Sequence, residues 1–146
     1  MRRGRAPLSL VATVVGLSLL TASCMSSLEG EDTRAGLSCV DDTPECVDQR
    51  QATLKSMLSD QERKWVKEPT SAKAHASGVR LFAFRAKKGE LSCEELVHGR
   101  READDVKKSL KGDTSLTPAQ VSRANLFAAE VSKELTAEIK KRRCKA

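Results

Sequence analysis

Aromatic side chains are scarce in this sequence of 146 residues. It has no tyrosine, and its four aromatic residues are Trp65, Phe82, Phe84 and Phe127. A surface that stacks nucleic-acid bases needs more aromatic side chains in one place. The formal net charge of +6 also overstates the basic character, because three arginines stand among the first five residues, ahead of an apolar run. We therefore expect no nucleic-acid partner.

Residues that could support catalysis or hold a cofactor are equally few. The two histidines, His75 and His98, are not accompanied by a recognisable nucleophile motif. The acidic pairs at 94–95 and 104–105 do not suit a glycosidase, because adjacent residues of a helix point about 100° apart. The sequence has no Cys-x-x-Cys motif, phosphate loop, calcium loop or metal-binding histidine pair. It thus predicts no enzyme activity and no cofactor.

The N-terminus has the pattern of an export signal. Arg2, Arg3 and Arg5 form a short cationic region, and residues 6–22 are uncharged and rich in leucine and valine. This apolar run is shorter than the ~20 strongly apolar residues that a stable membrane span needs. It ends in small residues that are followed by Cys24.

Residues 1–24 resemble the signal of bacterial lipoprotein precursors. Ala22, Ser23 and Cys24 match the end of the lipobox, in which small residues precede the cysteine that receives the lipid. Thr21 departs from the pattern, since leucine is more usual there. The resemblance implies removal of residues 1–23 and lipidation of Cys24. The alternative is an ordinary secretory signal followed by an unrelated cysteine.

The same resemblance predicts a location. The residue after the lipidated cysteine is Met25 rather than aspartate, which in Gram-negative lipoproteins implies sorting to the outer membrane, facing the periplasm. The inner membrane and the cell surface are less favoured, and the acyl chains make the membrane a binding partner. Residues 24–43 are rich in serine, glycine and acids and predict a flexible lipidated tether. Residues 44–146 then form the folded domain.

Four segments of this domain show helical periodicity. We expect helices from 44 to 67, from 72 to 88, from 93 up to Gly112, and from 118 to the basic residues near the C-terminus. Three of them begin at recognisable caps, which are Thr43, Ser92 and Thr117. Short connections favour antiparallel neighbours, so the sequence predicts an all-α fold, a small antiparallel bundle of about four helices.

The second segment is open to another interpretation. Residues 79–85 also fit a short strand, although the alanine content and the lack of a partner strand favour a helix. A continuous helix from 72 to 88 places His75, Val79 and Phe82 on one face.

Four cysteines remain once Cys24 is lipidated, and an even number in an exported chain implies two disulfides. In an up-down bundle, Cys39, Cys46, Cys93 and Cys144 meet at one end, which the disulfides would staple. We favour Cys46–Cys144 with Cys39–Cys93 over Cys39–Cys46 with Cys93–Cys144, while Cys46–Cys93 would join diagonal helices. A four-cysteine zinc site is the competing interpretation, but the spacing lacks the short cysteine pairs typical of such sites.

Basic residues gather at the same predicted end. They are Arg85, Lys87, Lys88, Lys140, Lys141, Arg142, Arg143 and Lys145. Close to a lipidated tether, they could contact anionic lipid or lipopolysaccharide phosphates. We prefer the interpretation that they complement the negative end of a helix.

These inferences lead to a functional hypothesis. The chain is expected to be a lipid-anchored cell-envelope protein that acts as a non-enzymatic interaction or adaptor module at the outer membrane. Its partner would be another envelope protein or peptidoglycan. The alternatives are a cell-wall-acting envelope enzyme and a periplasmic hydrolase inhibitor. A deep pocket with titratable groups would favour the enzyme, and a flat apolar or mixed surface would favour the other two.

Overall fold

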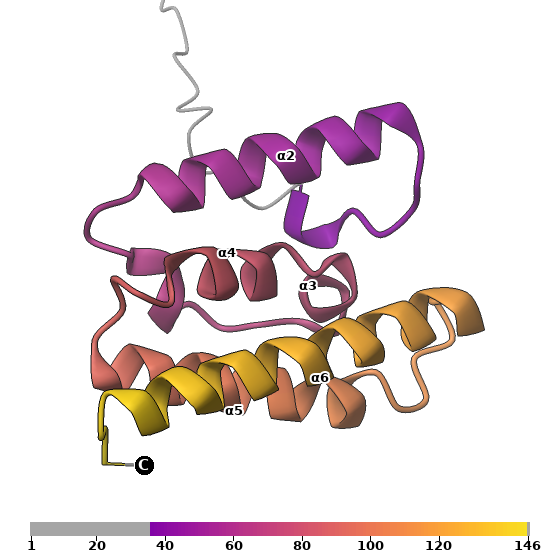
Figure 1. Ribbon diagram of the computed structural model, residues 1–146. Helices are drawn as coiled ribbons and strands as arrows, with labels where there is room; N and C mark the ends of the chain where they lie inside the picture. Colours follow the sequence, from indigo (N-terminus) through magenta and orange to yellow (C-terminus); the bar gives the residue numbers. More distant parts are fainter. Residues whose placement is uncertain (1–35, 146) are drawn as a thin grey trace, which may run out of the picture.

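The computed structural model describes residues 36–145, and this part of the chain is helical without any strand (Figure 1). Its elements follow in the order α2 Pro44–Ser59, the 3-10 helix η1 Lys64–Lys67, α3 Ala72–Ser77, α4 Val79–Lys87, α5 Cys93–Ser109 and α6 Pro118–Lys141. The predicted all-α class is confirmed, and residues 79–85 form a helix. None of the described helices has the length and hydropathy of a membrane span.

The helices begin where the capping signals predict. The Ser92 hydroxyl accepts from the backbone N–H of Glu95, whose carboxylate accepts from the backbone N–H of Ser92. Thr117 and Gln120 form the same reciprocal arrangement at the start of α6. The Thr43 side chain caps α2. These contacts satisfy backbone donors that the first turn of a helix leaves unpaired.

The first predicted helix, 44–67, is shorter than expected because its last turns take another conformation. α2 ends at Ser59, and the carboxylate of Asp60 accepts hydrogen bonds from two backbone N–H groups of the following turn. Arg63 then adopts a left-handed conformation with φ of 50°. This turn starts η1 in a new direction, which a helical periodicity cannot reveal.

The second predicted helix, 72–88, is divided in two by Gly78. This glycine has φ of 73°, ends α3 and directly precedes α4. A side chain is disfavoured there by the backbone conformation alone. The break changes the helical phase between the two halves. Phe82, expected on one face with His75 and Val79, is 50% exposed, whereas those two residues are buried.

The connection between η1 and α3 determines the direction in which α4 runs. Arg63 contacts Glu95 in the first turn of α5, whereas His75 contacts Ser109 at the end of α5. Between these contacts the chain travels the length of α5, ~25 Å at 1.5 Å per residue. α4 therefore runs in the same direction as α2, and α5 and α6 are antiparallel (Figure 1).

α4 lies between α2 on one side and the α5–α6 pair on the other (Figure 1). Its position explains why Leu81, Ala83 and Phe84 are fully buried. The Phe84 ring packs edge-on against Trp65 of η1, with ring centroids 4.8 Å apart. A Cβ on Gly99 of α5 would come within 2.5 Å of this ring, so the glycine allows the two helices to approach. The core thus spans all three layers.

The two disulfides lie at opposite ends of the domain. The prediction that all four cysteines meet at one end is therefore wrong, and so is the favoured pairing. Cys39 bonds to Cys46, and Cys93 bonds to Cys144. The first bridge lies beside the start of α6, because the Val40 carbonyl accepts from the Gln120 amide. The second joins the start of α5 to the end of α6, ~36 Å along a 24-residue helix. Four thiolates so separated cannot share one zinc ion.

The expected tether, 24–43, is described only from residue 36. Gly36 packs against α2, where an added Cβ would meet Thr53 and the Gln49 carbonyl. Farther along, Asp42 pairs with Arg123 of α6 at 3.0 Å. Residues 36–43 therefore lie on the domain, in contrast to the flexible linker that their composition predicts. Cys24 and the predicted signal at 1–23 lie outside the described residues.

Candidate functional site

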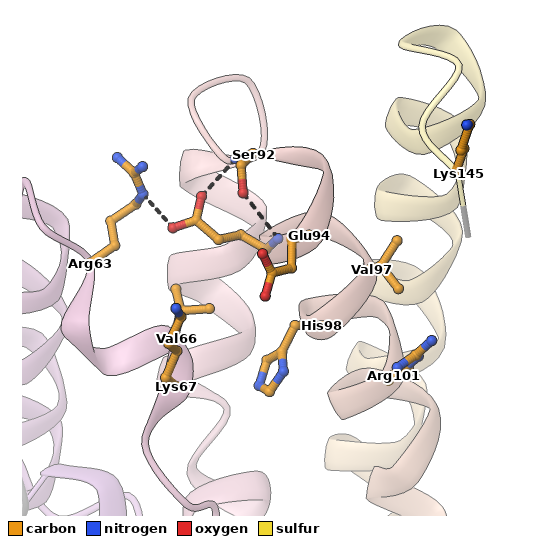
Figure 2. A pocket seen from close by; sticks show the side chains of 10 residues that line it. Arg63, Val66, Lys67, Ser92, Glu94, Val97, His98, Arg101 and Lys145 are labelled. Atoms are coloured by element: carbon orange, nitrogen blue, oxygen red, sulfur yellow. Dashed lines mark hydrogen bonds and ion pairs between the residues drawn. The ribbon is translucent and has the colours of Figure 1, made fainter.

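A cavity of about 550 Å³ opens between η1 and α5 at the end of the domain that holds the Cys93–Cys144 bridge. The residues that line it are Arg63, Val66, Lys67, Ser92, Glu94, Glu95, Val97, His98, Arg101 and Lys145. Figure 2 shows η1 on one side, and α5 with Lys145 from the C-terminal segment beyond α6 on the other. The lining is charged around its rim, and Val66 and Val97 contribute a small apolar surface.

Three of the lining residues are occupied by contacts with each other. The Arg63 Nε donates to the Glu95 carboxylate at 2.9 Å, and the same carboxylate accepts from the Ser92 backbone N–H at 2.6 Å (Figure 2). Partial burial alone would raise the pKa of Glu95, but the hydrogen bonds from Arg63 and Ser92 outweigh this effect and lower it. Glu95 is therefore ionised and cannot serve the other cations of the cavity.

The remaining charged groups of the cavity are unpaired. Lys67, Arg101 and Lys145 are exposed, and within the described residues none of them has an ion pair or a side-chain hydrogen bond. Glu94 is also exposed and points into the same space as His98 (Figure 2). The cavity thus offers three free cations and one free carboxylate, a net positive surface that suits an anionic ligand.

A buried ion pair lies behind the cavity. The guanidinium of Arg80 binds the Glu102 carboxylate through two hydrogen bonds of 2.8 and 2.7 Å, and it donates a third to the Trp65 carbonyl. The two side chains are only 1% and 5% exposed. His98 reaches from the cavity toward Glu102, with 4.0 Å between its Nε2 and a carboxylate oxygen. This ion pair ties η1, α4 and α5 together and holds the cavity walls.

The two histidines singled out in the sequence do not meet. His98 lines the cavity, whereas His75 is buried near the other end of α5, with its Nδ1 2.5 Å from the Ser109 hydroxyl. Burial lowers the pKa of His75, which favours a neutral ring. Its Nε2 has no hydrogen-bond partner in the described structure. The arrangement assigns His75 to the core.

The acidic pairs are likewise divided among separate contacts. At 94–95, Glu94 faces the cavity while Glu95 caps α5. At 104–105, Asp104 binds Arg100 at 2.9 Å. Adjacent residues of a helix point in different directions, so neither pair presents two carboxylates to one point.

The basic residues proposed to contact an anionic surface lie at the ends of α4 and α6, and most of them have partners. Lys88 and Arg85 both bind Glu134, and Lys87 binds Glu90 at 2.8 Å. At the end of α6, Lys141 pairs with Glu138, and Arg142 donates to the Leu91 carbonyl. Lys140 and Arg143 are exposed. The cluster shares the end of the Cys93–Cys144 bridge, so it lies far from Cys39, contrary to the expectation of one common cysteine end.

Sequence reasoning did not identify the free cations of the cavity as one group. Lys67 falls at the end of the predicted helix 44–67, Arg101 belongs to no motif, and Lys145 is one of the basic residues of the C-terminus. The one signal that could have joined them is the Cys93–Cys144 pairing, which brings the C-terminus to the start of α5.

No family model, curated protein or solved structure matches this chain.

Proposed function

We propose that this chain is a lipid-anchored protein of the cell envelope that acts as a non-enzymatic interaction module, held at the outer membrane by the lipid on Cys24. The anchor rests on the lipobox-like residues 20–24. The interaction role rests on one structural observation, the open cavity between η1 and α5 with its unpaired charges. Such a surface can bind a partner without any reacting group.

The positions of the titratable groups support binding over catalysis. His75 is turned into the core, Glu95 is held by Arg63 and Ser92, and Glu102 is paired with Arg80. An active site needs a base within hydrogen-bond reach of the proton that it removes. Tethering to a membrane raises the effective concentration of a domain near its target to roughly the millimolar range, so weak contacts suffice.

Two measurements in cells test this proposal. A fatty-acid probe should label the wild type, which should fractionate with the outer membrane, and it should not label Cys24→Ala. A photo-reactive amino acid at position 67 should then give a discrete crosslinked partner, whereas one at position 55, on the exposed face of α2, should not. An unlabelled wild type would refute the anchor, and equal crosslinking at both positions would refute the interaction surface.

The enzyme alternative depends on Glu94 and His98, which lie one helical turn apart and both line the cavity. A His98→Ala protein that folds should complement a deletion strain if binding carries the function. Loss of complementation by this variant, together with full activity of a soluble form that lacks the anchor, would instead favour an enzyme.

A further inference from the structure

We infer that the cavity between η1 and α5 binds a short acidic peptide segment of the partner protein, an inference that rests on the proposed interaction role. The ligand would place its carboxylates against Lys67, Arg101 and Lys145. These cations come from η1, α5 and the C-terminal segment beyond α6, so they surround the cavity rather than line one helix (Figure 2). Charge-assisted hydrogen bonds to carboxylates are the strong contacts that such groups form.

The backbone beneath each cation is fixed by an immediate neighbour. Lys67 follows Val66, which is 2% exposed. Arg101 precedes Glu102, which forms the buried ion pair with Arg80. The third cation, Lys145, follows the disulfide-bonded Cys144. A site whose backbone is already ordered loses less entropy when the ligand binds, which favours affinity.

The nearest competing carboxylate cannot neutralise these cations. Glu95 lines the same cavity but is held by Arg63 and by the Ser92 backbone. Glu94 is the one free acid of the lining, and it leaves an excess of positive charge. The structure therefore keeps three cations available for an external anion.

The lining also favours a peptide over other anions. Val66 and Val97 supply an apolar surface for a side chain between two acidic residues, and Glu94 can accept a backbone N–H of the peptide. No phenylalanine, tyrosine or tryptophan lines the cavity, so it lacks the large platform on which nucleic-acid bases stack. A membrane surface is flat and does not fit the hollow between η1 and α5.

Binding to a blocked acidic tetrapeptide, acetyl-Asp-Val-Glu-Glu-amide, tests the inference with the full chain purified in detergent. Isothermal titration should show saturable binding that the uncharged analogue acetyl-Asn-Val-Gln-Gln-amide does not reproduce. Replacing two cavity cations, Arg101→Glu with Lys145→Glu, should weaken binding at least about tenfold, the size of about one lost charged contact. The matched control, Lys55→Glu with Lys108→Glu, makes the same change of net charge on exposed positions away from the cavity. It should weaken binding less than about twofold, because exposed charges beyond a Debye length are screened.

A third variant separates position from charge. Cys93→Ser with Cys144→Ser keeps every cation but removes the bond that holds Lys145 beside α5. Circular dichroism should confirm that it is folded, and its affinity for the acidic peptide should fall below that of the wild type. Unchanged affinity would mean that the cavity geometry does not matter.

Three outcomes would overturn the inference. One is no saturable binding of the acidic peptide. The second is equal loss of affinity in the cavity variant and in its matched control. The third is binding to phosphatidylglycerol in mixed micelles that depends on Arg101 and Lys145 while the peptide does not bind, which would assign the cavity to a lipid surface. A crosslinked partner at position 67 in cells without peptide binding would leave the proposed interaction role intact and refute only the peptide chemistry.

Discussion

The two ends of this domain are held by different means. At the Cys39 end, a disulfide closes a sequence separation of 7 residues, and Asp42, a largely exposed acid, pairs with Arg123. At the Cys144 end, a disulfide closes a separation of 51 residues. The cavity beside it is backed by the buried Arg80–Glu102 pair, whose Glu102 stands midway along α5. A disulfide that closes a longer loop restricts the unfolded chain more. Breaking a buried ion pair costs more stability than breaking an exposed one.

This difference places the rigid part of the molecule beside the cavity. η1, α4 and α5 meet at the Arg80 guanidinium, and the C-terminus is bonded to the start of α5. A binding site is effective when its side chains stand on such fixed elements. Variants that weaken one end but not the other can measure the difference directly.

The largest expected effect is the loss of the Glu102 carboxylate. Glu102→Leu leaves the Arg80 guanidinium buried without its charged partner, so the free energy of unfolding should fall by about 3–5 kcal/mol. At the other end, Asp42→Ala removes two ion pairs, with Arg123 and Arg50, but the carboxylate is 70% exposed, so the loss should stay below about 1 kcal/mol. Urea denaturation followed by circular dichroism measures both values.

The double variant Arg80→Met with Glu102→Leu is the control for this prediction. It removes both charges and leaves apolar side chains in their place, so it should recover most of the stability that the single variant loses. A double variant as unstable as Glu102→Leu would show that the three hydrogen bonds, rather than the unpaired charge, determine the loss.

The next effect separates the two disulfides. Loop closure predicts a stabilisation of about 4 kcal/mol for the Cys93–Cys144 bridge and about 2.5 kcal/mol for the Cys39–Cys46 bridge. Serine pairs at each bridge should therefore reduce the free energy of unfolding unequally in the same urea assay. Equal losses would mean that native contacts around the bridges, and not the loop length, set their contribution.

The sequence predicted the class of the fold because its helix starts are encoded locally. A cap such as Ser92 with Glu95 needs only four consecutive residues, and it formed as expected. The helix ends were less predictable. The chain leaves α2 because Asp60 binds the following turn, and α3 ends at Gly78 because glycine tolerates a left-handed conformation. Neither residue interrupts the apolar periodicity.

The direction of α4 and the disulfide pairing could not be predicted for a related reason. Both depend on residues 60–71, which carry the chain back along α5, and a short connection was expected to reverse it instead. Once α4 runs with α2, Cys46 and Cys144 lie at opposite ends. The buried Arg80 was missed because an arginine within an apolar stretch carries no sign of its partner 22 residues away.

A smaller effect is expected where α4 and α5 touch. Gly99→Ala places a Cβ against the buried Phe84 ring, and such overpacking typically costs about 1–3 kcal/mol. Gly89→Ala, in the connection that precedes α5, meets no atom within 4 Å and has no positive φ. It should be neutral or stabilising by up to about 1 kcal/mol. Thermal unfolding of both variants measures the contrast, and similar midpoints would show that Phe84 can move aside.

The smallest expected effect is the loss of stability at low pH that arises from His75, which lies near the Cys39 end of α5. Burial lowers the pKa of this imidazole in the folded state, and the nearby Arg80 also lowers it. The Glu102 carboxylate acts in the opposite direction and raises this pKa. The unfolded chain, with an ordinary histidine pKa near 6.5, therefore binds more protons than the folded protein as the pH falls below that value. The stability that His75 contributes is present above pH ~6.5 and is lost toward lower pH until the folded-state pKa is passed.

His75→Leu should remove this part of the pH dependence. The slope between pH 6.5 and 5 should become flatter by at most about 1.4 kcal/mol per pH unit, the limit for one proton. His98→Gln is the matched control, because it also removes one histidine, but one whose side chain is 48% exposed. The slope should also persist in the Arg80→Met and Glu102→Leu double variant, since burial has a larger effect on His75 than either neighbour. Disappearance of the slope there would assign the effect to the ion pair, and urea denaturation across the pH range distinguishes the two causes.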